Sequence, residues 1–454
     1  MLDIKFIREN KKEIELAAKN KNLKIDLDKL LFLDDAKRGL ILQINDLRTK
    51  RNELASQSKN NRPTDEQIIY GKQLKEQISE LENNLITVEK DYLELAVKVP
   101  NIPSVDTPIG KSEKENVEVY KWGEPTKFDF KPKSYIELAK ELDLIDFERG
   151  TKTGGYRGYY LKNEAVMLVM GFMMYALEKL IKNGFTPVIP PTLVKNFALF
   201  GSGYFAGEKY NSDVDEIYKI ANDDKLADGS TKKEDKFLIG TAEPSLLAYY
   251  SDEILDEKNL PIKFAGFSQC YRSEIGSYGK DTKGIYRVHE FMKVEQVVIC
   301  RDNKEESDKL HQEIISLSKE LHEDLGLPYR QIQICTGDMS AGKYKMFDIE
   351  AWIPSRNGYG ETGSASNFLD WQSRRLNVKY KNKNGEKKYV YMLNNTALAS
   401  PRTLIAILEN YQQEDGSIVV PKVLRKYLPG KPNKIMTNYK FPMTNQCQNP
   451  NIKK

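Results

Sequence analysis

The stretch "CYRSEIGSYGKDTKGIYRVHEFMKVEQVV", residues 270–298, places a polar segment between two flanks rich in apolar and β-branched residues. The polar segment contains Gly276, Gly279 and Gly284, and glycine lets a backbone turn back at positive φ. The pattern therefore predicts a long β-hairpin with one strand in each flank. Arginines and glutamates stand on both sides of the turn, so we expect opposite charges to converge there around a polar ligand.

Other segments favour an α+β fold built on an antiparallel sheet flanked by helices. Amphipathic helices are expected over 134–146, 163–184 and 401–412. Strands are expected over 185–191, 236–243, 330–337, 346–354, 359–368 and 387–399. Strands that follow one another as hairpins indicate antiparallel pairing. The sequence contains no GxGxxG or GxxxxGK[ST] motif, which argues against a Rossmann fold and a P-loop.

Leucines before residue 100 predict an elongated element. Leu33, Leu40, Leu47 and Leu54 recur every seven residues, and residues 74–95 continue with alternating steps of four and three. The pattern predicts an antiparallel two-helix coiled-coil arm over about 28–97, with helices about 45–50 Å long at 1.5 Å per residue. Such an arm could act as a spacer or a dimerisation element, or it could reach a distant partner.

Basic residues gather near the expected end of this arm. They are Arg48, Lys50, Arg51, Lys59 and Arg62. Positive charge at the end of an arm suits a phosphate backbone, so these residues are candidate contacts to a nucleic acid. The whole chain carries 70 Lys and Arg against 66 Asp and Glu, a net charge of +4. That balance confines any site for a polyanion to local clusters.

The chain of 454 residues is long enough for several domains. We expect an arm domain over 1–100, a linker over 101–133, a large α+β domain over 134–430 and a C-terminal tail over 431–454. Four cysteines without a CxxC spacing and three dispersed histidines predict no disulfide framework and no structural zinc site. No apolar run approaches the ~20 residues of a membrane span, so we expect a soluble, cytoplasmic protein without a membrane partner.

Several side chains have the chemistry of a nucleotide and amino-acid site. Guanidinium groups bind polyphosphates, hard oxygens bind divalent cations, carboxylates bind ammonium groups, and an aromatic ring stacks on a base. The candidates are, in that order, Arg272, Arg287 and Arg402; Glu361 and Ser364; Glu243 and Glu295; and Phe291. Each has a plainer alternative, such as a core position for Phe291, a solvated loop for Glu361 and a surface position at a helix N-terminus for Arg402.

In their order along the chain, these segments resemble the class II aminoacyl-tRNA synthetases. "GFTPVIPP" at 184–191 resembles motif 1, "YRSEIG…YRVHEFMKVE" at 271–295 resembles motif 2, and "LASPRTLIAILEN" at 398–410 resembles motif 3. Within that class, "GTAEPSL", "CTGDMSAGKYKMFDIEAW", "ETGSASNFLDWQSRR" and the N-terminal "MLDIKFIREN" are similar to the seryl-tRNA synthetase family of bacterial type. The resemblance extends from residue 1 to about residue 430.

The resemblance implies roles for the matching residues, with Arg272, Glu361 and Arg402 as the catalytic ones. The implied ATP-binding residues are Arg272, Ser273, Glu274, Arg287, Val288, Phe291, Glu361, Thr362, Gly363, Ser364 and Arg402. Glu361 and Ser364 match the ligands of Mg²⁺. The implied serine-binding residues are Thr241, Ala242, Glu243, Arg272, Glu295, Asn394 and Thr396. Lys280 and Lys283, in the hairpin loop, join the basic residues of the arm as implied tRNA contacts.

The implied activity is ATP-dependent and Mg²⁺-dependent serine–tRNA ligation. Serine would form seryl-adenylate with release of pyrophosphate, and then pass to the 3′-terminal adenosine of tRNA(Ser), and of tRNA(Sec) where present. Attack by the serine carboxylate needs positioning and charge stabilisation rather than a nucleophilic side chain, which fits the lack of a Ser-His-Asp or Cys-His set. A homodimer through motif 1 is also implied.

Two alternatives stay open. A related enzyme could load an amino acid onto a carrier other than tRNA, but it would not need the arm. A non-enzymatic coiled-coil scaffold would not need Arg272, Glu361 and Arg402, which are all present.

Two segments depart from the family pattern. Ala397, Ala399, Ser400 and Pro401 stand where motif 3 usually carries glycines, so the backbone before Arg402 has less freedom. Residues 222–236 form a longer connection than usual, and their charge and Gly-Ser content predict a solvated surface hairpin.

Overall fold

The computed structural model describes residues 1–57, 63–205, 210–275 and 283–436. The chain divides into two compact units, Met1–Ile102 and Pro103–Lys454. Within the described residues, no helix contains a segment that is long and apolar enough to cross a membrane.

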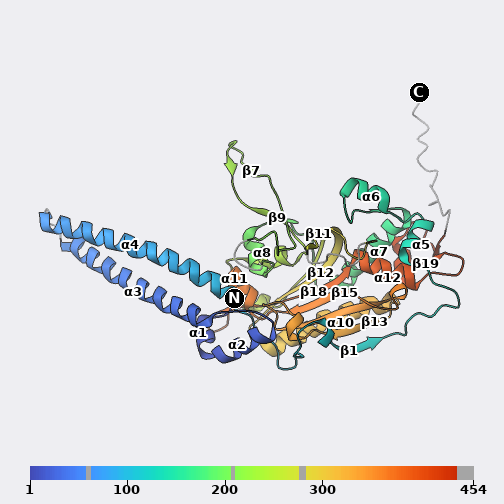
Figure 1. Cartoon of the computed structure of the whole chain (residues 1–454), viewed down its shortest axis with the longest axis horizontal. Coiled ribbons are helices and arrows are strands. Elements are labelled where there is room, and N and C mark those ends of the chain that lie inside the picture. Colours follow the sequence, from blue (N-terminus) through green and yellow to red (C-terminus); the bar gives the residue numbers. More distant parts are fainter. Residues whose placement is uncertain (58–62, 206–209, 276–282, 437–454) are drawn as a thin grey trace. The chain divides into compact units, whose positions relative to one another are not determined.

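The N-terminal unit consists of helices, two of which are long. Its helices are α1 (Ile4–Glu9), α2 (Lys11–Asn20), α3 (Leu27–Gln57) and α4 (Asp65–Ala96). Figure 1 shows α3 and α4 lying side by side along their length. Leu33, Ile44, Leu74 and Ile78 are buried in the unit, and α4 begins with a capping box between Thr64 and its third residue. The predicted helical arm is confirmed, because the apolar seams give each helix a face to bury.

The second unit is built on an eight-stranded sheet with the order β1-β13-β14-β15-β18-β12-β11-β4. Its strands are β1 (Val117–Trp122), β4 (Thr186–Val188), β11 (Ile262–Tyr271), β12 (Glu290–Cys300), β13 (Tyr329–Gln333), β14 (Lys345–Ile353), β15 (Gly358–Asn367) and β18 (Tyr391–Ala399). All neighbours pair antiparallel except β11 and β4, which pair parallel. The expected α+β fold and the hairpin from β11 to β12 are confirmed.

Helices cover this sheet and complete the main hydrophobic core. The larger ones are α7 (Asn163–Lys182), α10 (Lys304–Asp324) and α12 (Ser400–Asn410). Leu168, Ile314 and Ile405, one from each helix, are fully buried in the same cluster as the sheet residues Val294 and Leu398. Helix α10 packs beside β15 and β18 (Figure 1).

Shorter elements surround the sheet. The helices are α5 (Tyr135–Glu141), α6 (Phe147–Gly154), α8 (Asn196–Ser202), α9 (Glu243–Leu247) and α11 (Trp371–Leu376). The strands are β2 (Ile145–Asp146), β3 (Tyr160–Leu161), β5 (Leu193–Lys195), β6 (Tyr218–Lys219), β7 (Asp224–Lys225), β8 (Thr231–Lys232), β9 (Lys236–Leu238), β10 (Ile254–Asp256), β16 (Lys379–Lys381), β17 (Lys387–Tyr389), β19 (Ile418–Val419) and β20 (Lys434–Ile435). Strands β7 and β8 pair antiparallel, which confirms the surface hairpin expected within 222–236.

The structure corrects several expected boundaries. Helix α5 ends at Glu141 rather than near 146, because Asp143 adopts φ +52° and the chain then enters β2. The segment 101–133 is more than a linker, since it contains β1, whose mostly exposed side chains gave no buried apolar pattern. Strand β12 begins at Glu290, and the run 387–399 divides into β17 and β18, which belong to different sheets.

Candidate functional site

A pocket with about 500 Å³ of empty space, part of it open to solvent, lies at the end of the β11–β12 hairpin. Its lining residues are Arg272, Glu274, Tyr286, Arg287, Val288, Phe291, Lys293, Glu361, Thr362, Gly363, Thr396, Ala399, Pro401 and Arg402. They come from β12, β15, β18, the start of α12 and the segment between β11 and β12. The sheet thus brings together the candidate residues of motifs 2 and 3, which are more than a hundred positions apart in the sequence.

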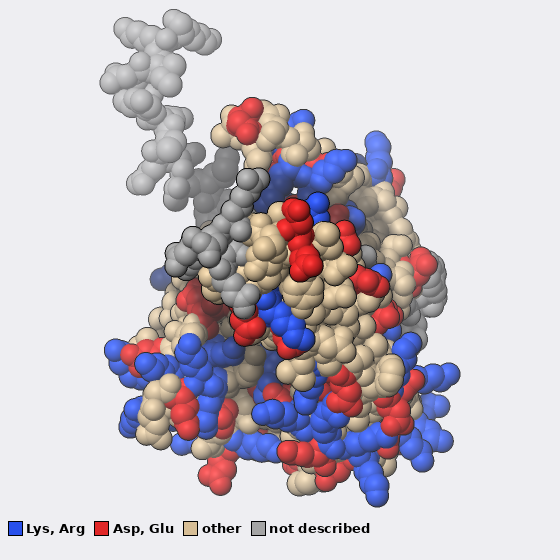
Figure 2. Space-filling view, turned by 90° about the vertical axis from the view of Figure 1, so that its left-hand side faces the viewer, with Lys and Arg blue, Asp and Glu red and all other residues tan. Residues whose placement is uncertain are grey.

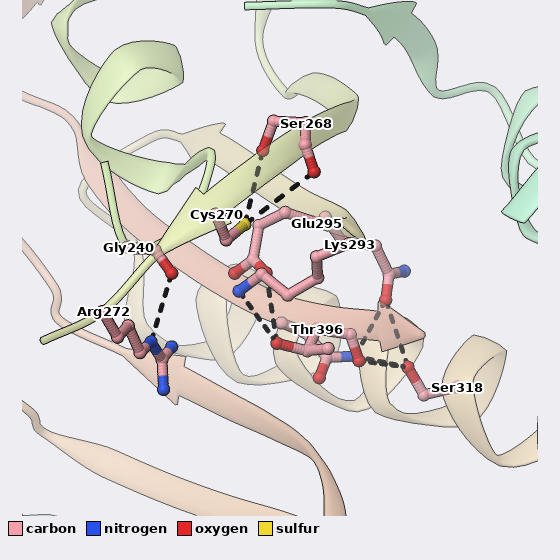
Figure 3. A network of polar contacts seen from close by, with 10 residues as sticks. Gly240, Ser268, Cys270, Arg272, Lys293, Glu295, Ser318 and Thr396 are labelled. Carbon is pink, nitrogen blue, oxygen red and sulfur yellow. Dashed lines mark hydrogen bonds and ion pairs between the residues drawn. The ribbon is translucent and has the colours of Figure 1, made fainter. Parts of the chain in front are cut away.

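Arg272 follows directly after β11 and lines this pocket, and Figure 3 shows its side chain beside the carbonyl of Gly240. Its Nε donates a hydrogen bond to the carbonyl oxygen of Gly240 at 3.2 Å, and its guanidinium lies 5.4 Å from the centre of the Phe291 ring. Phe291 is the cross-strand neighbour of Cys270, so pairing of the hairpin fixes the ring beside the arginine. A fixed cation beside an aromatic face suits the phosphate and base of a nucleotide.

Glu274 lies in the left-handed region at φ +54° and its side chain is almost fully buried. Two arginines approach the same carboxylate oxygen, Oε2: Nη1 of Arg157 at 3.4 Å and Nη1 of Arg287 at 3.3 Å. These charges keep the carboxylate in one orientation, and a buried acceptor in a fixed place can select an amino group. Sequence reasoning missed Arg157, because no periodic pattern connects it with motif 2.

Arg402 and Glu361 lie beside each other in the pocket lining. Nη1 of Arg402 donates to the backbone carbonyl of Glu361 at 2.9 Å and lies 3.1 Å from its Oε2. The guanidinium also lies 4.5 Å from the centre of the Tyr286 ring, a residue that sequence reasoning missed. Desolvation of the carboxylate in the pocket would raise the pKa of Glu361, but the guanidinium groups of Arg402 and Arg272 outweigh this effect and lower the pKa. Glu361 is therefore held as a carboxylate.

Asp348 adds a second carboxylate beside Glu361. It is the cross-strand partner of Ser364, and its Oδ1 is buried without a hydrogen bond from the described residues. Burial and the negative charge of Glu361 raise the pKa of Asp348. Two carboxylates and a hydroxyl form a hard oxygen donor set, which suits Mg²⁺. The described residues nevertheless contain no group of three or more His, Cys, Asp or Glu side chains arranged to hold a metal ion by themselves.

A second polar group lies deeper, where Glu295 on β12 faces Thr396 on β18. Oγ1 of Thr396 donates to Oε2 of Glu295 at 3.1 Å. Nζ of Lys293 lies 2.5 Å from the same carboxylate oxygen and 3.1 Å from Oγ1 of Thr396 (Figure 3). Sequence reasoning missed Lys293, although alternation along a strand places it on the same face as Phe291 and Glu295.

Thr241, just before α9, and Glu243, the first residue of α9, are both buried. Nε2 of Gln372 donates to Oε1 of Glu243 at 2.7 Å. Burial and then the negative charge of Glu295 raise the pKa of Glu243 to about 7. The hydroxyl of Thr241 is buried without a hydrogen bond from the described residues. A buried carboxyl group with a pKa near 7 and a buried hydroxyl without a hydrogen bond suit a small polar ligand with an ammonium group.

Other predicted residues lie beside these groups rather than in the pocket lining. Ala242, Asn394 and Ser364 are buried or half-buried near them, and the hydroxyl of Ser273 is buried without a hydrogen bond from the described residues. Ser400 and Pro401 stand at positions where motif 3 usually carries glycines. Oγ of Ser400 accepts a hydrogen bond from the Met292 amide at 3.0 Å, and Pro401 lies in the first turn of α12. These residues therefore support β12 and α12 at Arg402.

The basic residues of the arm are more balanced by acids than expected. Nη2 of Arg48 lies 2.7 Å from Oε1 of Glu82, and Nζ of Lys50 lies 2.7 Å from Oδ2 of Asp46. Arg51 is exposed, and Lys59, Arg62 and Lys280 lie outside the described residues. Over the face in Figure 2, Lys and Arg gather with Asp and Glu among them. Acids therefore lie among the bases on this face, in line with the net charge of +4.

Two family models match the chain. The model described as "Seryl-tRNA synthetase N-terminal domain" matches residues 1–103, and the one described as "tRNA synthetase class II core domain (G, H, P, S and T)" matches residues 218–411.

The chain is also similar to curated and structurally solved proteins along nearly its whole length. It is 43% identical to a serine–tRNA ligase of Borrelia garinii over 94% of this chain and 98% of that protein. It is 42% identical to the serine–tRNA ligase of Treponema denticola over the same shares. The seryl-tRNA synthetase of Pyrococcus horikoshii, solved as a complex with ATP, has a TM-score of 0.83 at 38% identity and covers 96% of this chain and 100% of its own.

Proposed function

Because this chain belongs to the seryl-tRNA synthetase family of class II aminoacyl-tRNA synthetases, we propose that its pocket holds ATP and serine side by side. The enzyme is a serine–tRNA ligase that activates L-serine with ATP and transfers it to tRNA. The observation that carries the assignment of the site is the convergence of Arg272, Glu361 and Arg402 in one pocket with Glu274 and Phe291.

Different residues of the pocket bind different parts of ATP. The Phe291 ring stacks on the adenine base. The carboxylate of Glu274 accepts a hydrogen bond from the adenine amino group. Arg287 and Arg402 both line the pocket and bind the β- and γ-phosphates. Ser273, Val288, Thr362 and Gly363 complete the walls around the nucleotide.

Activation is attack by the serine carboxylate on the α-phosphorus, with pyrophosphate as the leaving group. Arg272 lines the same pocket as Phe291 and Arg402 and as Lys293 and Thr396, so its guanidinium holds the serine carboxylate and the α-phosphate within reach of each other. The hydrogen bond from Arg272 to Gly240 and the Phe291 ring hold the guanidinium in place before the substrates arrive. The arginines stabilise the charge that develops on the phosphate, and no side-chain nucleophile is needed.

Glu361, which lines the pocket, and Ser364, whose cross-strand partner is Asp348, have the donor set for Mg²⁺ bound to the polyphosphate. When bound, the ion would neutralise part of the phosphate charge. Arg402 orients the Glu361 carboxylate toward the pocket through its contacts with the backbone and side chain.

Serine is recognised by polar groups that are already buried. Glu243 and Thr241 receive the ammonium group, while Glu295, Thr396 and Asn394 surround the side chain, with Ala242 as the adjacent wall. The hydroxyl of serine pairs with Glu295 and Thr396. Alanine would leave these buried groups unsatisfied, which gives a strong basis for its rejection.

The test is pyrophosphate exchange with each of the twenty amino acids, followed by charging of purified tRNA pools. We expect exchange with serine to exceed exchange with alanine by about 10⁴-fold, because a site built around a hydroxyl rejects the analogue that lacks it. Charging of tRNA(Ser), and of tRNA(Sec) where it is present, supports the ligase. Serine-dependent exchange without tRNA charging would instead favour a ligase for another carrier.

The N-terminal unit supplies the tRNA contacts in this proposal. Its basic residues Arg48, Lys50 and Arg51, with Lys59 and Arg62, contact phosphates, and Lys280 and Lys283 contact the acceptor end. The unit divides from the rest at Ile102, near the boundary at 100 proposed for the tRNA-binding domain. We place the catalytic domain over 134–430, with β1 of the preceding segment completing its sheet, and the enzyme in the cytoplasm, where tRNA is charged for protein synthesis.

A homodimer through the motif 1 segment is the proposed assembly. Helix α7 carries exposed apolar side chains at Val166, Met170, Met174 and Ile181, at helical spacing, and β4 lies at an edge of the sheet. An exposed apolar stripe beside an open sheet edge suits an isologous interface.

We expect a mass of twice 52.2 kDa by light scattering at micromolar concentration. Met170→Glu with Met174→Glu should weaken the dimer by about 100-fold or more, because two charges would be buried in the interface. Ile254→Glu, at a half-exposed position on β10, is the matched control and should leave the mass unchanged. An active wild-type monomer would contradict this proposal.

A further inference from the structure

Lys293 is a buried lysine that contacts Glu295 and Thr396, the residues proposed to bind the serine hydroxyl. Its side chain is only 5% exposed, and it lines the pocket together with Thr396. A buried ammonium group is unfavourable unless it is paired, and Lys293 is paired twice, with Oε2 of Glu295 at 2.5 Å and with Oγ1 of Thr396 at 3.1 Å. Figure 3 shows its side chain reaching toward both partners between β12 and β18.

These contacts determine how Glu295 and Thr396 present their oxygens. Lys293 and Thr396 both reach Oε2 of Glu295, and no hydrogen bond from the described residues reaches Oε1. Since the Lys293 ammonium can only donate, Oγ1 of Thr396 accepts from it and turns its own hydrogen to Glu295. One carboxylate oxygen is therefore occupied, and the other is held as an acceptor for a ligand hydroxyl.

The opposite face of the sheet holds the same two strands firmly. Nδ2 of Asn395 donates to Oε1 of Gln296 at 2.8 Å and to Oγ of Ser318, on α10, at 2.7 Å. Oγ of Ser318 also donates to the backbone carbonyl of Thr396 at 3.2 Å. The backbones of Glu295 and Thr396 are thus fixed from behind, and the remaining freedom lies in their side chains, where Lys293 acts.

We propose that Lys293 is a specificity-determining positioning residue, which selects serine by locking Glu295 and Thr396 as a preformed acceptor and donor for the substrate hydroxyl. This rests on the proposed function. Lys293 acts through Glu295 and Thr396, so the loss from removing it should fall on substrates that carry a hydroxyl, and much less on ATP.

The main test is Lys293→Met, which keeps the length of the side chain and removes its charge. We expect KM for serine to rise about 30-fold or more, because a buried carboxylate loses its partner. The ratio of kcat/KM for serine to that for alanine should fall about tenfold or more. Alanine has no hydroxyl to bind Glu295 and Thr396, so it loses less than serine does. KM for ATP should stay within about twofold of the wild-type value.

Lys263→Met is the matched control. Lys263 lies on the neighbouring strand β11, and its Nζ is 2.5 Å from Oε1 of Glu313, away from the pocket lining. It should leave the KM for serine and the serine-to-alanine ratio unchanged. If Lys293→Met fails to fold, Lys293→Gln, which removes the charge but keeps a side-chain donor, should show the same directions of change at smaller size; unchanged KM for serine and unchanged discrimination in it would count against the inference.

A pH profile separates positioning from loosened structure. The charged groups acting on Glu243 are Glu295, Lys293 and Lys343, and Lys293 lowers the pKa of Glu243 against the effect of burial. Glu243 must be ionised to bind the serine ammonium, so KM for serine should fall as pH rises through its pKa. In Lys293→Met this fall should move to higher pH, whereas a merely loosened fold would admit water to Glu243 and move the fall to lower pH.

A double-mutant cycle with Glu295→Gln completes the test. If Lys293 acts through Glu295, the double variant should lose little beyond Glu295→Gln alone. A folded Lys293→Met enzyme with unchanged KM for serine and unchanged discrimination, or fully additive losses in the cycle, would overturn the inference. If the wild-type protein itself shows no serine-dependent exchange, the proposed function fails rather than the role of Lys293.

Discussion

Deleting residues 36–90 and joining the ends with a Gly-Ser turn is expected to reduce serine transfer to tRNA at least about 100-fold, through the lost phosphate contacts. Serine-dependent pyrophosphate exchange should stay close to the wild-type rate. The physical reason is that α3 and α4 bury their apolar seams against each other, in a unit separate from the catalytic pocket. Charging assays and exchange assays on the same preparation measure both effects.

Charge on the arm can be varied without deleting it. Arg48→Ala, Lys50→Ala and Arg51→Ala together should weaken tRNA binding and flatten its salt dependence, by about one unit of slope for each lost phosphate contact. Glu82→Ala with Asp46→Ala is the matched control, because it removes the acids that pair with Arg48 and Lys50 and frees both bases. This control should bind tRNA at least as tightly as the intact enzyme. Normal charging by the deletion variant would mean that the arm is only a spacer.

Glu361→Ala is expected to lower pyrophosphate exchange about 100-fold or more, because the carboxylate proposed to hold Mg²⁺ at the polyphosphate is lost. Arg402 also loses the partner that lies 3.1 Å from its Nη1. Exchange should recover partly at high Mg²⁺ concentration, and the Mg²⁺ dependence of ATP binding by calorimetry should weaken in parallel. The fold should remain intact, since the Glu361 side chain is about half exposed.

Glu313→Ala is a suitable comparison for this variant. Glu313 on α10 also loses an ion pair, with Lys263, but it lies outside the pocket lining. We expect it to exchange pyrophosphate at the normal rate with the normal Mg²⁺ dependence. A Glu361→Ala enzyme with near-normal exchange at ordinary Mg²⁺ would remove Glu361 from the site.

Local patterns were sufficient to predict some elements of the fold. The helices α3 and α4 followed from heptad spacing, because a helix has a fixed period and buries a stripe that can be read over a few turns. The hairpin from β11 to β12 followed from two β-branched flanks around a glycine-rich segment. Strand β1 escaped prediction, since an edge strand with exposed side chains carries no such buried alternation.

By itself, then, the sequence determined the arm, the α+β class and the motif residues Arg272, Glu361 and Arg402, because each is written in a local run of residue types. Tertiary structure decided which side chains complete the site. Lys293 meets Thr396 across 103 positions and Gln372 meets Glu243 across 129 positions. Such partners come together only when strands pair and helices dock. The packing of these distant segments also determines whether a charged side chain is buried with a partner or exposed to solvent, and no local pattern encodes it.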